Sequence, residues 1–179
     1  MSPITRFLSG LAFLVFALAF AAPAQQAPPQ LQPPAGEQLF LTVHAKGDQV
    51  YSCKPDGSQF AWLLKAPDAD LFDADGNLFG KHFAGPSWMA SDTSRVNGKA
   101  VASAPSPDPD SIPWLLIHVV SHEGNGVLAR ATSIQRLNTK GGRAPASGCD
   151  SAHENQESRS PYTADYLFFA PKESTQAGK

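Results

Sequence analysis

The sequence predicts an all-β protein, folded as a mainly antiparallel sandwich or barrel, and three observations favour this class. Residues 39–44 alternate between apolar and more polar side chains with a period of two, as a half-buried strand does. Short apolar runs recur along the chain between turns rich in Pro, Gly, Asn and Asp. A parallel sheet needs crossover connections of about a dozen residues, usually helical, and the chain offers at most one short helix, near 151–157.

Turn residues divide the chain into its expected strands. Pro55–Ser58 and Asp73–Asn77 are turns because Pro presets φ and Gly accepts positive φ. Ala66-Pro67 is expected to end a strand, and the prolines between 104 and 111 predict a stiff loop. Ser151 and Glu154 have the spacing of a capping box, which is why 151–157 alone is expected to be helical. The expected strands cover 39–44, 50–53, 60–64, 78–83, 99–103, 114–121, 127–137 and 162–169.

The first residues predict export. Arg6 precedes the apolar run Phe7 to Phe20, and Ala22-Pro23-Ala24 offers the small residues that signal peptidase requires. A secreted or periplasmic location is therefore expected. The chain divides into a signal peptide (1–24), a disordered lead-in rich in Pro and Gln (25–36), a single β-rich domain (37–171) and a flexible tail (172–179).

The expected location bears on the redox state of the two cysteines of the chain. In an oxidising compartment Cys53 and Cys149 most simply form one disulfide, which would close a long loop. Free thiols or a redox couple are the alternatives, although the Cys-x-x-Cys spacing typical of redox couples is absent.

Charge and hydropathy exclude several partner classes. The formal net charge is −2, and no run of Lys and Arg suggests a nucleic-acid or anionic-membrane footprint. No second apolar run of about 18 residues follows the first, so no membrane span is expected after cleavage.

Histidines provide the candidate metal ligands. His118 and His122 share a face of an expected strand but lie about 13 Å apart there, too far to bind one ion. His82 and His153 sit near loops and could converge with Asp92 on a metal ion, which would suit a metal-assisted hydrolase or oxidoreductase. The simpler interpretation is that these histidines are hydrogen-bonded structural residues.

Other catalytic and cofactor motifs are incomplete. Asp73–Gly76 lacks the spacing of a calcium-binding EF-hand and is better explained as a turn. Gly124–Ala129 matches G-x-G-x-x-A by letter, but a strand-like segment follows where a dinucleotide site needs a helix. No G-x-S-x-G elbow is present. The sequence therefore predicts no cofactor.

Aromatic residues provide the candidate ligand-binding site. His82 and Trp88 lie in a segment rich in Gly, Pro and Phe, and Tyr162 and Tyr166 share one face of an expected strand. Such rings could stack on a sugar or another flat ligand, or they could form the core, where aromatic side chains contribute most to burial.

Several segments in order resemble a known family, the exported bacterial and fungal proteins catalogued as domain of unknown function 3455. The segments are Gln49–Cys53, Ala66–Leu71, Gly80–Trp88, Ile112–Leu116, Ile134–Gly142, Cys149 and Tyr162–Tyr166. A local departure is Asp92-Thr93-Ser94, where the family usually has Asp-Gly-Ser. The resemblance implies an exported β-rich domain and brings no established activity. Some fungal relatives carry a malate dehydrogenase label, which the incomplete dinucleotide motif does not support.

The predicted function is a non-enzymatic exported binding or envelope-associated domain. Its ligand would be a small molecule, a glycan or an envelope component, bound near His82, Trp88, Tyr162 and Tyr166. The alternative is the metal-assisted enzyme that uses His82 and His153.

Overall fold

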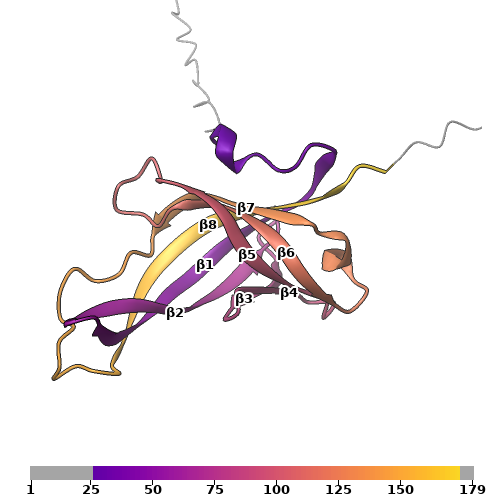
Figure 1. The fold of residues 1–179 in the computed structure, drawn as a ribbon. Helices are drawn as coiled ribbons and strands as arrows, with labels where there is room; N and C mark the ends of the chain where they lie inside the picture. Colours follow the sequence, from indigo (N-terminus) through magenta and orange to yellow (C-terminus); the bar gives the residue numbers. More distant parts are fainter. Residues whose placement is uncertain (1–25, 174–179) are drawn as a thin grey trace, which may run out of the picture.

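The computed structural model describes residues 26–173, in which eight antiparallel strands form one closed barrel (Figure 1). Each strand pairs with its neighbours in the sequence, and β1 closes the barrel by pairing with β8. The all-β prediction is confirmed, and of the two expected architectures the barrel is the one that forms. The elements are η1 (Pro29–Leu31), β1 (Glu37–Asp56), β2 (Gln59–Phe72), β3 (Leu78–Phe83), β4 (Ser87–Ala90), β5 (Arg95–Ala104), β6 (Trp114–Glu123), η2 (Val127–Arg130), β7 (Ser133–Gly141) and β8 (Glu157–Pro171).

The signal peptide expected over residues 1–24, and most of the tail expected over 172–179, lie outside the residues that the structure describes. Within 26–173, no helix is long and apolar enough to cross a membrane.

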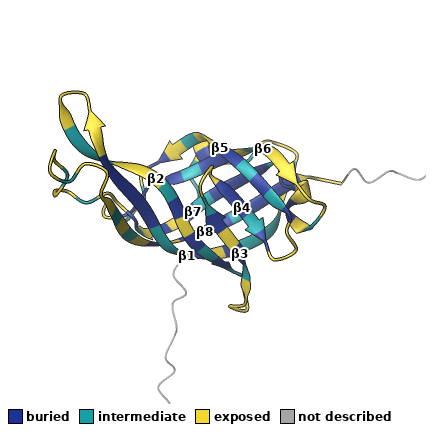
Figure 2. Ribbon diagram, turned by 90° about the horizontal axis from the view of Figure 1, so that it is seen from below, coloured by how far each residue is buried: buried dark blue, intermediate teal, exposed yellow. Residues whose placement is uncertain are grey.

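The strands β1 and β2 are longer than the sequence predicts. The two strands expected at 39–44 and 50–53 are one continuous strand, and β2 runs through Pro67, where a strand end was predicted. Pro67 is tolerated because the register shifts close to it, between Val50 and Tyr51, and a proline without an N–H fits beside such a bulge. β2 pairs with β3 only over Ala69–Phe72. The part of the β1–β2 hairpin nearest its turn therefore extends past the barrel, and the tip of this hairpin is exposed (Figure 2).

Two local predictions were wrong. In the segment 151–157, residues 151–155 form turns instead of a helix and Glu157 already belongs to β8. The reason is that the backbone of the segment bonds to strand β1: Asn155 N donates to the Cys53 carbonyl, and Cys53 N donates to the Gln156 carbonyl, both at 2.9 Å. The segment expected to begin a strand at Val127 is instead the short helix η2. Side chains of the β4–β5 turn accept its first N–H groups, with Val127 N 2.7 Å from Asp92 Oδ2.

Large side chains fill the barrel. Buried and exposed residues alternate along the strands (Figure 2), and the inward set includes the fully buried Trp88, Tyr166 and Phe168. Small residues make room for them: a Cβ atom on Gly98 would lie 2.4 Å from Ile117 Cγ2 and 3.0 Å from Trp88 Cζ3. An eight-stranded barrel has an interior just wide enough for side chains to fill or to hold one small ligand.

A second apolar cluster lies on the outer face of the barrel, where the segment before β1 packs. Leu31 of η1 is completely buried against Trp114 and Leu137, and its carbonyl accepts a 2.6 Å hydrogen bond from Gln135 Nε2. The prediction of a disordered lead-in over 25–36 was therefore wrong for the residues around η1. The reason is that one leucine supplies the apolar surface needed to cover this patch.

The predicted disulfide is confirmed. Cys53 of β1 is bonded to Cys149 in the long connection between β7 and β8, with the two Cα atoms 5.3 Å apart. The bond fastens this connection, residues 142–156, to the extended part of the β1–β2 hairpin.

Candidate functional site

Four connections lie at one end of the barrel, here called the hairpin end: β1–β2, β3–β4, β5–β6 and β7–β8. Antiparallel pairing of strands in sequence order places alternate connections at the same end. Two of them, β5–β6 and β7–β8, lie side by side here, because Ser111 and Gly142 form an isolated antiparallel bridge beyond the paired part of β6 and β7. Ile112 N donates to the Gly141 carbonyl at 2.9 Å, and Thr139 Oγ1 donates to the Ile112 carbonyl at 2.6 Å.

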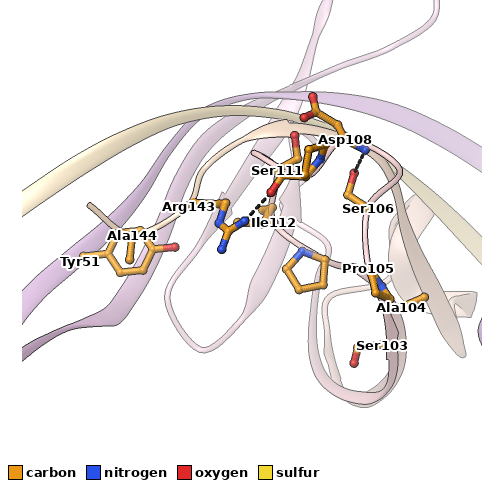
Figure 3. Close-up of a pocket in the computed structure, with 12 residues that line it drawn as sticks. Tyr51, Ser103, Ala104, Pro105, Ser106, Asp108, Ser111, Ile112, Arg143 and Ala144 are labelled. Carbon is orange, nitrogen blue, oxygen red and sulfur yellow. Dashed lines mark hydrogen bonds between the residues drawn. The ribbon is translucent and has the colours of Figure 1, made fainter. Parts of the chain in front are cut away.

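A groove of about 490 Å³ opens at the hairpin end (Figure 3). It lies between the proline-rich β5–β6 connection on one side and Tyr51, Arg143 and Ala144 on the other. The three prolines predicted to stiffen this loop include Pro105 and Pro109, which both line the groove. The groove therefore has one wall whose shape is restricted by proline rings.

The polar groups of this groove already have partners. The guanidinium of Arg143 donates to the Pro109 carbonyl (Figure 3), and the Tyr51 hydroxyl donates to the Gly142 carbonyl at 2.7 Å. Burial raises the pKa of Tyr51, although the nearby charges of Arg136 and Arg143 oppose this shift. Tyr51 is therefore a neutral phenol at neutral pH.

The carboxylate of the groove is Asp108. It accepts hydrogen bonds from the backbone N–H of Asp110 at 3.1 Å and from Lys140 Nζ at 3.1 Å. These bonds, the backbone one first, lower the pKa of Asp108 below its ordinary value. The groove thus contains an ionised, partnered carboxylate and the cation of Arg143.

Arg136 lies below the groove and faces the barrel interior. On β7, Ile134 belongs to the interior core, whereas Gln135 and Leu137 contact the outer cluster. Since side chains alternate along a strand, Arg136 shares the inward face with Ile134. Its Nε and Nη2 atoms donate to the Pro113 carbonyl at 3.1 and 2.9 Å, directly beneath the loop that lines the groove.

Four buried polar atoms of the interior have no hydrogen-bond partner among residues 26–173. They are Gln49 Nε2, Trp88 Nε1 and the hydroxyl oxygens of Tyr162 and Tyr166. Burial raises the pKa of both tyrosines, so both hydroxyls keep their protons and can donate. A buried donor without a partner costs about 1–3 kcal/mol, which makes this cluster unusual for a structural core.

An aromatic stack occupies the same interior. The His82 ring lies parallel to Trp88, with centroids 4.3 Å apart, and Tyr166 meets both rings edge-on at 5.0 and 5.4 Å. His82 Nδ1 lies 2.8 Å from the Ser87 carbonyl, an acceptor only, so Nδ1 is the protonated nitrogen. Burial lowers the pKa of His82 to about 3, and the ring is therefore neutral.

The sequence-predicted aromatic site is brought together by the fold. His82, Trp88 and Tyr166 are in contact, and Tyr162 faces the same interior two inward positions away from Tyr166 along β8, with Ala164 between them. Their exposed fractions are only 3, 1, 0 and 3% in the order His82, Trp88, Tyr166, Tyr162. The rings therefore form part of the barrel interior, which is the second of the two interpretations that the sequence left open. Ligand binding by this group stays a prediction.

The candidate metal ligands have separate partners. His82 is inside the barrel, His153 Nδ1 lies 2.7 Å from Asp150 Oδ1 in an exposed turn, and Asp92 accepts bonds from Ser94 and Val127. These bonds, that from the Ser94 hydroxyl first, lower the pKa of Asp92. Within residues 26–173, no three His, Cys, Asp or Glu side chains are grouped to hold one metal ion. The geometry gives the metal-assisted alternative no support.

Sequence reasoning missed Gln49, Tyr51, Arg136 and Arg143 as site residues. The signal for Arg136 is weak, since Gln135 precedes it and either polar side chain could face the interior. Arg143 follows two glycines in an irregular connection, where no periodicity indicates its direction.

The fold and the site define a closed antiparallel β-barrel with a groove at one end and a cluster of polar donors below it. The model of the family described as "Protein of unknown function (DUF3455)" matches residues 34–170, and the chain belongs to this family. No curated protein and no solved structure matches the chain.

Proposed function

We propose that this chain is a non-enzymatic, exported domain that binds a small molecule in the groove at the hairpin end. The observation that carries the proposal is the groove of about 490 Å³ directly above the interior donors, a volume typical of ligand sites. The Cys53–Cys149 bond and the predicted signal peptide support a secreted or periplasmic location.

The groove residues favour binding over catalysis. Tyr51 keeps its proton because burial raises its pKa, and Asp108 is ionised and bonded to Lys140. Neither group titrates near neutral pH, as an efficient general acid or base would. The volume of the groove, about 490 Å³, also suits a small molecule better than a large envelope component.

The proposal is tested by ligand titration followed by ¹H–¹⁵N NMR, with four probes: benzoate, benzamide, indole and N-acetylglucosamine. We expect at least one aromatic probe to shift the amide signals of residues 103–113 and 142–144. N-acetylglucosamine distinguishes the sugar-binding alternative. If no probe binds, or if the shifts fall outside the groove, the proposal is wrong.

Two tryptophan variants supply matched controls. Ala144→Trp places a large ring in the groove from an exposed position and should abolish binding. Ala146→Trp adds the same ring to the same connection, at an exposed residue that does not line this groove, and should leave binding unchanged.

A further inference from the structure

Arg136 carries a positive charge that no carboxylate balances. None of the ion pairs found among residues 26–173 includes it. Of the five N–H donors of its guanidinium, two are directed to the single carbonyl of Pro113. The side chain therefore keeps both an unmatched charge and spare donors below the groove.

The unpartnered interior atoms surround this cation. Arg136 and Tyr166 are paired across β7 and β8. Burial raises the pKa of Tyr166, and the nearby guanidinium of Arg136 and the Tyr162 hydroxyl, both within reach of the Tyr166 hydroxyl, partly oppose this shift. The Tyr162 hydroxyl lies close in turn to the Gln49 amide. All of these uncharged side chains are more than nine-tenths buried, and each unpartnered atom is a donor or a hydroxyl that can donate.

A guanidinium flanked by phenol hydroxyls and an amide N–H complements a planar anion with two acceptor oxygens. We propose that the barrel interior is a head-group site for a carboxylate, which pairs with Arg136 and accepts hydrogen bonds from Tyr162 and Tyr166. This inference rests on the proposed function, because the remainder of the ligand lies in the groove.

The Pro113 carbonyl marks the entrance to this site. This carbonyl accepts hydrogen bonds from the guanidinium of Arg136, and Pro113 itself lines the groove. A carboxylate entering from the groove replaces this carbonyl as the acceptor, so that no donor loses its partner during binding. A purely structural role, in which Arg136 only braces the β5–β6 connection, accounts for the bonds to Pro113 but not for the gathering of buried donors around a cation that has no ion-pair partner among residues 26–173.

The test compares benzoate with benzamide, which share a ring and size but differ in charge. The full chain with its disulfide intact is titrated with each probe, and the Trp88 indole N–H signal reports on the interior. We expect benzoate to bind about 10- to 100-fold more tightly than benzamide, as expected for hydrogen bonds to a charged group. Benzoate should also shift the Trp88 signal.

Two substitutions, with one control, test which residues cause the preference for benzoate. Arg136→Gln should reduce the benzoate-to-benzamide ratio to about one, because the charge is lost. Arg130→Gln removes a guanidinium at the opposite end of the barrel, where Arg130 stacks on Phe40, and should keep the ratio. Tyr166→Phe retains the ring and should weaken benzoate binding about tenfold with little effect on benzamide. It also tests the site if Arg136→Gln does not fold.

The outcomes separate this inference from the proposed function. Equal affinities for benzoate and benzamide, with shifts in the groove, would overturn the carboxylate site and leave the binding groove intact. A charge preference that survives in both Arg136→Gln and Tyr166→Phe would also overturn it, and would point to Arg143 as the cation. Failure of both probes and of indole to bind would overturn both proposals.

Discussion

Acid should destabilise the barrel through one buried histidine. Burial lowers the pKa of His82 from 6.5 to about 3, so the unfolded chain takes up this proton at a higher pH than the folded chain does. The stabilisation from neutral His82 is therefore complete above about pH 6.5 and is lost progressively as the pH falls toward 3. The full difference corresponds to about 5 kcal/mol, of which about 2 kcal/mol should be lost between pH 7 and pH 5.

The assay is guanidinium unfolding followed by tryptophan fluorescence at both pH values. His82→Asn keeps an N–H group for the Ser87 carbonyl but does not titrate, so its free energy of unfolding should fall less than that of the original chain. The difference between the two proteins should shrink by about 2 kcal/mol from pH 7 to pH 5. His118→Asn, at an exposed position on β6, serves as the control and should follow the original chain. If His82→Asn loses as much stability as the original chain, the reasoning about His82 is refuted.

Three further predictions concern stability, each measured by guanidinium unfolding at neutral pH. Replacing both Cys53 and Cys149 by Ala opens a loop with a sequence separation of 96 and should lower the free energy of unfolding by about 2–4 kcal/mol; an unchanged value would contradict the role of the bond. Gly142→Ala should cost about 2–4 kcal/mol, because φ is +82° and the new Cβ would lie 2.9 Å from a buried side chain. The control Gly148→Ala has a φ of +84° but open space, so it should cost clearly less. Leu31→Ala should cost about 2–4 kcal/mol, and a change below about 0.5 kcal/mol would mean that η1 does not stabilise the barrel.

Local sequence patterns were sufficient to predict that the strands exist, but not where each strand begins and ends. The period-two alternation of residues 39–44 correctly predicts part of β1, and the turn residues correctly mark the β1–β2 and β2–β3 connections. The continuation of β2 through Pro67 depends on a bulge opposite β1, which is a property of the pair of strands. The burial of Leu31 likewise depends on a patch formed by β5, β6 and β7 together.

The candidate site shows the same division. His82, Trp88, Tyr162 and Tyr166 could be selected from the sequence as a group, because aromatic residues cluster in two segments. The sequence could not show whether these side chains face solvent or the interior. Each strand of an antiparallel sheet presents two faces, and the sequence does not say which face is enclosed. Closure of β8 onto β1 decided that the rings are buried.

The sequence by itself determined the all-β class and the membership of the family, because turn chemistry, alternation and residue identity are local properties. It predicted the Cys53–Cys149 bond but left free thiols open, and the tertiary structure decided this point by bringing the two Cα atoms to 5.3 Å. Only the tertiary structure decided that the sheet closes into a barrel and that Arg136, rather than Gln135, faces its interior. Adjacent residues of a strand always point to opposite faces, so two neighbouring polar residues leave the choice open. The register of β7 against β6 and β8 makes that choice, and with it places a cation among the unpartnered donors below the groove.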